Sequence, residues 1–214
     1  MSASWGCSMM AYCRHIQQHL MRDANLSLRP YYARRVAKEP GVLPALVAAV
    51  AAGRAAAAPS LQRAAVDGAC ALSDVAKVAP ALALRVAQEP GVLPALLAAL
   101  EAGGAAAAPN VQGLARNCAA VLASLAEASP ELARRVSQAP GALPALVAAA
   151  SAGGAAAEAS LQDAASNSTT VVAQAALAGS DIARRVAEAP GALPALVAAV
   201  AAGGSAAEYL VLVE

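Results

Sequence analysis

The chain is poor in aromatic residues, which make up 2% of its 214 residues and include no phenylalanine. Charged residues are also scarce at 14%, whereas 59% of the residues are hydrophobic. The scarcity of aromatic side chains argues against a β-sandwich or β-barrel, and the hydrophobic content excludes an intrinsically disordered chain. Because alanine, leucine and valine dominate the sequence, we expect an all-α protein whose helices pack closely through small side chains.

The chain also lacks a surplus of either charge. Its fifteen lysine and arginine residues stand against fourteen acidic residues, so the net charge is +1. Nucleic-acid binding usually needs a basic surplus that displaces counterions from the phosphates. We therefore expect no nucleic-acid partner.

The cysteines form no CxxC pair and no regular framework; they are Cys7, Cys13, Cys70 and Cys118. This usage is typical of a reducing compartment and predicts a cytoplasmic or nuclear location.

Long uninterrupted apolar runs are missing as well. The longest uncharged stretch, Val136–Ala157, is broken by Pro140, Pro144 and Gly153. The helix that fits inside it, Leu143–Ala152, would be about 15 Å long, whereas the hydrocarbon core of a bilayer is about 30 Å thick. We expect no membrane span.

Signals of enzymatic chemistry are absent. The chain has no GxSxG elbow and no phosphate-binding loop, and both histidines, His15 and His19, lie near the N-terminus. Their i, i+4 spacing suits a zinc pair with Cys7 and Cys13 nearby, but Cys13 does not share their helical face and tetrahedral ligation needs four donors. We expect no enzyme, no cofactor and no metal.

An internal repeat dominates the sequence. Pro-Gly-Val-Leu-Pro-Ala-Leu-Val begins at Pro40, and close variants begin at Pro90, Pro140 and Pro190, which is a period of 50 residues. Such a period is typical of stacked helical units, none of which can bury its apolar face alone.

Each repeat predicts three helices. The first is Glu131–Gln138 in the third repeat, capped by Ser129 and ended by a left-handed turn at Gly141. The second starts with Pro144 near its first position. In the second repeat this helix carries one buried stripe and ends at Gly103-Gly104; the stripe is Leu93, Leu96, Leu97 and Leu100.

The third helix is the longest, and its predicted N-caps are Ser60, Asn110 and Ser160. Its apolar positions recur at spacings of four, seven and three residues, which lie on one helical face. They are Leu61, Ala65, Leu72 and Val75, then Val111, Ala115, Leu122 and Leu125.

Residues 30–205 resemble the armadillo repeat family, through Gly141–Ala149 and through Val111–Leu125, which resembles the third helix of that family. HEAT repeats are the alternative, but three segments per repeat favour armadillo. The resemblance implies a right-handed α-solenoid of about three and a half three-helix repeats, here with the 50-residue period. It also implies a protein-interaction role, since the family includes nuclear import adaptors, junction proteins and cytoskeletal or ciliary scaffolds.

One departure argues against an import adaptor. Family members that bind extended peptides carry an Asn ladder on the third helix, with Trp one turn earlier. The Asn column here is Asp74, Ser124 and Gln174, and the Trp column is Cys70, Ala120 and Thr170. Lysine stems of a nuclear-localisation peptide would find no aromatic slots.

The same helical face continues towards the N-terminal end of each third helix with further polar residues. If the third helices line a concave groove, as the resemblance implies, amide and carboxylate groups at repeated spacing can bind an extended protein segment. The alternative is an ordinary solvated face. The predicted groove residues are Arg63, Asp67, Asp74, Asn117, Ser124, Asp163, Asn167, Thr170 and Gln174.

A column of arginines marks the first helices, at Arg35, Arg85, Arg135 and Arg185. It allows two interpretations. The arginines form a ridge for an acidic partner, or they pair with Glu39, Glu89 and Glu188, which we favour because such surface pairs are common.

The ends of the chain depart from the repeat. Residues 1–29 are interpreted as a partial repeat that caps the stack, with an organelle-targeting presequence as the alternative.

Residues 206–214 form an apolar tail where the next third helix should start. Leu193, Leu196 and Val197 should therefore be only partly covered, unless the tail caps them, and this end should associate with another chain. A structural subunit that stacks in a larger assembly is thus the alternative to a scaffold that binds through its groove.

Overall fold

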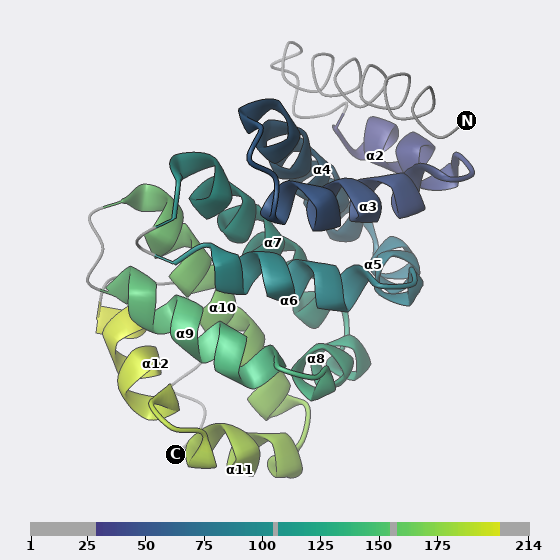
Figure 1. The fold of residues 1–214 in the computed structure, drawn as a ribbon. Coiled ribbons are helices and arrows are strands. Elements are labelled where there is room, and N and C mark those ends of the chain that lie inside the picture. The colour runs from purple at the N-terminus through teal and green to yellow at the C-terminus, as the bar shows by residue number, and fades with distance from the viewer. Residues whose placement is uncertain (1–28, 105–106, 155–157, 202–214) are drawn as a thin grey trace.

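The computed structural model describes residues 29–104, 107–154 and 158–201. Over these ranges the chain forms eleven helices and no strand, which confirms the predicted all-α class. The helices follow one another from one end of the molecule to the other in chain order (Figure 1). Their bounds recur at the 50-residue spacing of the sequence repeat.

The first helix of each repeat is short and ends at a Pro-Gly turn. Ser129 caps α8 as predicted, since its side chain accepts a hydrogen bond from the Leu132 N–H at 3.2 Å. Gly141 at the turn has φ +77°, a left-handed conformation that glycine adopts without steric cost. The four helices are α2 (Arg29–Lys38), α5 (Pro80–Gln88), α8 (Pro130–Gln138) and α11 (Ser180–Glu188).

The second helices carry the predicted leucine stripe, and in α6 all four leucines are buried. They start earlier than expected, so Pro144 stands at the third helical position of α9 rather than at the first. A proline is tolerated there because the N–H groups of the first turn have no partner within the helix. The second helices are α3 (Val42–Arg54), α6 (Val92–Ala102), α9 (Ala142–Gly154) and α12 (Ala192–Ala201).

The third helices start one residue before the predicted caps. The N-cap residues of α4 and α7 are Ala58 and Ala108, and neither makes a side-chain cap hydrogen bond. Proline follows at the first helical position, where its fixed φ and missing N–H suit a helix start. The prediction that Ser60, Asn110 and Ser160 are N-caps is therefore wrong. The third helices are α4 (Pro59–Val78), α7 (Pro109–Ala128) and α10 (Ala159–Leu177).

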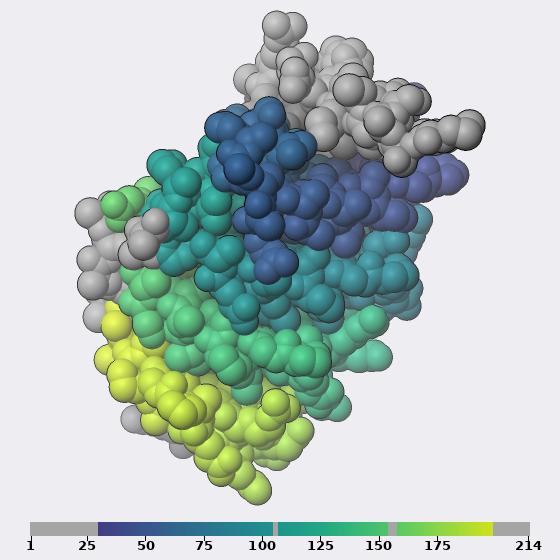
Figure 2. Space-filling model, in the orientation of Figure 1, coloured from purple at the N-terminus to yellow at the C-terminus, as the bar shows by residue number. Residues whose placement is uncertain are grey.

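Each kind of helix packs in a different way. Third helices pack on one another, α4 on α7 and α7 on α10, and second helices do the same from α3 to α12. First helices pack mainly against third helices, and α2 is bent 97° from α3. One continuous core of small and branched side chains runs through the helices. Figure 2 shows the outer face in the same orientation, with the segments following one another in chain order from the N-terminal to the C-terminal end.

Close helix approach explains a glycine near the C-terminal end of the second helices α3, α6 and α9. A Cβ atom on Gly103 would collide with the Cβ of Ala115 on α7, and Gly53 and Gly153 face Ala65 and Ala165 in the same way. Glycine is required here by the distance between neighbouring helices.

In the part of the chain that the structure describes, no helix has both the length and the apolar character needed to cross a membrane by itself. Pro30–Lys38 and Val42–Arg54 meet that requirement only as a pair, and the chain bends sharply between them.

Candidate functional site

The predicted groove residues lie on three helices that are neighbours in space, α4, α7 and α10. A hydrogen bond fixes their relative register: Asn117 Nδ2 on α7 donates to the Val66 carbonyl on α4 at 3.0 Å. Because Val66 immediately precedes Asp67 in the sequence, Asn117 of α7 lies against the turn of α4 that carries Asp67. We call Arg63, Asp67, Asn117, Asp163 and Asn167 the third-helix face.

The α4 part of this face is an ion pair. Arg63 Nε and Asp67 Oδ1 are 3.3 Å apart, four residues apart on one helix. The Arg63 side chain is 68% exposed, whereas that of Asp67 is 19% exposed. Most of the guanidinium therefore remains accessible, although the pair itself is worth little in solvent.

The α7 part is built around Asn117. Its Oδ1 accepts from Arg116 Nε at 3.2 Å while its Nδ2 bonds to α4. The amide is half-buried and held from both sides, so its orientation is preorganised. The side chain thus ties two helices together as well as contributing to the face.

The α10 part is more open. Asn167 Nδ2 donates to the Asp163 carbonyl at 2.9 Å, and the Asp163 side chain is exposed. The face therefore has an ion pair with an accessible guanidinium at its α4 end and an acidic group at its α10 end.

Two of the predicted groove residues are not exposed. Ser124 and Thr170 are 4% and 5% exposed, and their hydroxyls donate to the carbonyls of Ala120 and Ser166 on their own helices. Short hydroxyl side chains on a helix readily bond back to the preceding turn. The prediction that these two side chains are exposed on the groove is therefore wrong. Asp74 and Gln174, which were predicted in the same column as Ser124, are half-buried.

A gap in the face was not predicted. Gly113 occupies the register of Arg63 and Asp163, and a Cβ there would meet only Val66 Cγ2, at 3.9 Å. The absence of a side chain leaves room between the basic and acidic ends. The glycine was visible in the sequence, but its surroundings were not.

No set of three or more histidine, cysteine, aspartate or glutamate side chains within the described ranges is arranged to hold a metal ion. The histidines and Cys7 and Cys13 lie outside those ranges, as does the 206–214 tail. Cys118 is fully buried beneath the third-helix face, and this burial raises the pKa of its thiol. A thiol of this kind stays protonated and is a poor nucleophile.

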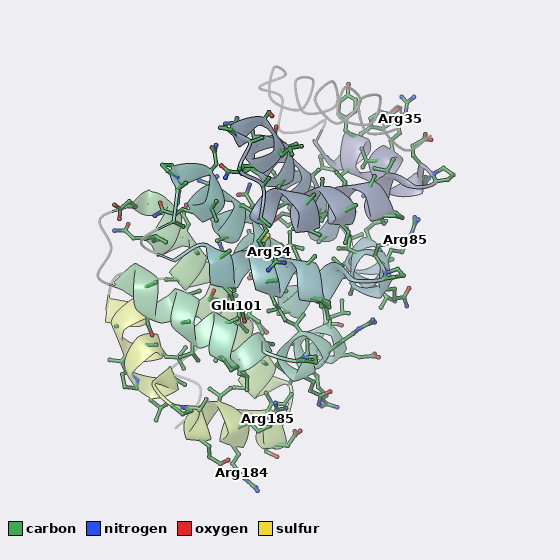
Figure 3. The ribbon with its side chains drawn as sticks, viewed as in Figure 1. Arg35, Arg54, Arg85, Glu101, Arg184 and Arg185 are labelled. Atoms are coloured by element: carbon green, nitrogen blue, oxygen red, sulfur yellow. The ribbon has the colours of Figure 1, made fainter. Side chains whose placement is uncertain are left out.

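The arginine column is exposed on α2, α5, α8 and α11. Figure 3 shows Arg35 and Arg85 at one side of the molecule and Arg185 on α11 at its lower end. Within the described ranges the arginine column does not form the predicted ion pairs with Glu39, Glu89 and Glu188. The ion pair found there is Arg63–Asp67. Solvation and side-chain entropy outweigh such weak surface pairs. The neighbouring Arg134 donates instead to the Ala178 carbonyl at 2.6 Å, at the end of α10.

Three apolar residues of α12 are only partly covered, as predicted. Leu193 and Val197 are 56% and 64% exposed, and Leu196 is half-buried.

Comparisons with protein-family models, with curated proteins and with solved structures find no match to this chain. Its function therefore has to be argued from its own surfaces.

Proposed function

We propose that the chain is a non-enzymatic scaffold that binds an extended segment of a partner protein across its third helices. We infer a right-handed solenoid of armadillo type as its architecture. The 50-residue spacing of the helix triplets, the 97° bend between α2 and α3, and the stacking of α4, α7 and α10 support this arrangement.

The observation that carries the proposal is the hydrogen bond from Asn117 to the Val66 carbonyl. It brings Asn117 of α7 against the turn of α4 that carries Asp67. Asn167 holds the same repeat position on α10, where it donates to the Asp163 carbonyl of its own helix. Amide and carboxylate groups at such repeated positions can hydrogen-bond the N–H and C=O groups of an extended chain. Three helices at 8–10 Å intervals span about 16–20 Å, which needs a segment of about five or six residues at about 3.3 Å per residue.

The charges of the face define the direction of the bound segment. Arg63 favours an acidic side chain at the α4 end, and Asp163 favours a basic one at the α10 end. Between them, the space above Gly113 accepts a larger side chain. A segment with an acidic end, a bulky centre and a basic end fits best.

A random-peptide selection against the folded chain tests the proposal, followed by calorimetric titration of the selected peptides. We expect acidic and basic residues at opposite ends of the selected segments. Asp163→Lys should weaken the binding of these peptides about tenfold or more, since repulsion replaces attraction at one end. The matched control is Asp181→Lys, which makes the same charge change on α11 and should leave binding unchanged. If the original chain and the Asp163→Lys variant bound the selected peptides with equal affinity, the proposal would be contradicted.

The exposed end of α12 favours a second function, a structural subunit that stacks in a larger assembly. Leu193 and Val197 offer adjoining apolar surface that the corresponding residues of other repeats bury. Light scattering over a concentration series should show association that the double substitution Leu193→Gln and Val197→Gln abolishes. Leu84→Gln with Leu177→Gln, two exposed leucines elsewhere, is the matched control. A chain that stays monomeric at every concentration would exclude self-association through α12.

A further inference from the structure

We propose that the chain has a second interaction surface, an arginine ridge that binds an acidic, extended segment of a partner protein. The ridge consists of Arg35, Arg85, Arg135 and Arg185 on the first helices. It lies on different helices from the third-helix face, so it is independent of the function proposed above.

The ridge is the one charged position that all four repeats keep on their first helices. Other exposed positions there have diverged: the residues four positions earlier are Tyr31, Ala81, Glu131 and Asp181, and those three positions later are Lys38, Gln88, Gln138 and Glu188. Buried positions and turn residues are retained for packing and backbone reasons. Neither packing nor backbone conformation requires an arginine at an exposed position. Its retention in all four repeats therefore points to a contact outside the described fold.

No ion pair within the described fold uses the ridge guanidinium groups. An acidic residue stands one helical turn away in every repeat, at Glu39, Glu89, Glu131 and Asp181, yet none forms an ion pair in the described ranges. Each guanidinium carries five N–H donors in a planar fork that matches a carboxylate. The ridge therefore offers one exposed donor group to solvent on each first helix. Figure 3 shows three of these arginines, on α2, α5 and α11.

A groove of about 830 Å³ lies beside the ridge at Arg135. Leu93, Pro94 and Pro140 supply apolar parts of its lining, Arg135 supplies a basic part and Glu131 an acidic one. Arg134 also borders the groove, but it is already bonded to the end of α10. The groove can hold the backbone of a bound segment while Arg135 binds a carboxylate.

The charge pattern favours an acidic polypeptide over a nucleic acid. Glutamates such as Glu89 and Glu131 interrupt the ridge and would repel a continuous row of phosphates, whereas separate carboxylates can avoid them. First helices pack mainly against third helices and not on one another, so we expect their arginines to lie farther apart than the 8–10 Å of packed helices. Three or four residues of an extended chain cover about 10–13 Å, so acidic residues at such intervals are the spacing to test.

Fluorescence anisotropy tests the proposal with a labelled peptide of about sixteen residues that carries Glu-Glu at every fourth position. We expect saturable binding at low salt that weakens steeply as salt is added. Arg85→Gln, Arg135→Gln and Arg185→Gln, combined in one variant, should weaken it about tenfold. The control removes the same charge elsewhere, with Arg54→Gln, Lys77→Gln and Arg184→Gln, which are exposed and belong to neither surface, and should bind within about twofold of the original chain.

Both variants lower the net charge from +1 to −2, so a difference between them reports position rather than total charge. Circular dichroism of both checks that the helices remain folded. Equal weakening in the two variants, no saturable binding of the acidic peptide, or tighter binding of an oligothymidylate of equal length would each overturn the proposal.

Discussion

The second helices α6 and α12 have closely similar sequences but very different surroundings. Leu93 and Leu97 on α6 are 8% and 4% exposed, whereas Leu193 and Val197 at the same register on α12 are 56% and 64% exposed. The helix α6 packs between α3 and α9, whereas α12 packs on α9 alone among the second helices. The repeat motif thus specifies an apolar helical face, and the neighbouring repeat decides how much of that face is buried.

The largest expected effect follows directly from this comparison. Leu93→Ala should lower the free energy of unfolding by about 2–4 kcal/mol, because it leaves a cavity between packed helices. Leu193→Ala makes the same change at a mostly exposed site and should cost less than about 1 kcal/mol. Chemical denaturation of the two variants measures both values. Similar losses would mean that α12 is covered as fully as α6.

A second contrast lies at the C-terminal end of α6, in two adjacent glycines. Gly103→Ala should destabilise the chain by about 1–3 kcal/mol, since the added methyl group collides with Ala115 and the helices must move apart. Gly104 has no atom near the position of a Cβ, so Gly104→Ala should be close to neutral. Thermal unfolding followed by circular dichroism compares them, and a stable Gly103→Ala variant would show that the helix contact is loose.

The features that were predictable from the sequence are those fixed within one helix or one turn. The leucine stripe of α6 follows from the 3.6-residue period, and the left-handed Gly141 follows from its place after Pro140. The wrong N-caps have a local cause too. At Ser60 and Asn110 a preceding proline competes for the helix start and takes the first position.

Features that depend on the distance between helices were not predictable. A Gly-Gly pair indicates a helix end, but only the structure shows that Gly103 touches α7 and Gly104 touches nothing. The arrangement of the third-helix face was not predictable for the same reason. The sequence places Asn117 and Ser124 on one side of α7, whereas the structure directs Asn117 to a neighbouring helix and Ser124 back to its own.

The third-helix register also contrasts Cys118 with its counterparts Gly68 and Ser168 in the adjacent repeats. Burial raises the pKa of the Cys118 thiol above its ordinary value of 9.0, so the folded chain keeps the thiol proton after the unfolded chain has lost it. The unfolded state then binds fewer protons, and stability falls as the pH rises above about 9. We expect the original chain to lose about 1.4 kcal/mol per pH unit relative to Cys118→Ala in that range. Denaturation series at pH 7, 9 and 10 measure this difference. A constant difference would show that the thiol is not buried.

The smallest expected effect is a gain in stability at Ser168, which occupies the register of Cys118 in the next repeat. Its hydroxyl is fully buried and has no hydrogen-bond partner, although most buried polar groups in folded proteins have one. Ser168→Ala removes the desolvation cost of that hydroxyl and improves helix propensity, so it should stabilise the chain by about 1 kcal/mol.

Ser124→Ala is the matched control, because that serine is also buried on a third helix but donates to the Ala120 carbonyl at 2.7 Å. Its removal loses that hydrogen bond, which the gain in helix propensity only partly offsets, so Ser124→Ala should be neutral or destabilising by up to about 1 kcal/mol. Urea denaturation of both variants separates the two cases, and a destabilised Ser168→Ala variant would indicate that a water molecule or another group binds the hydroxyl in solution.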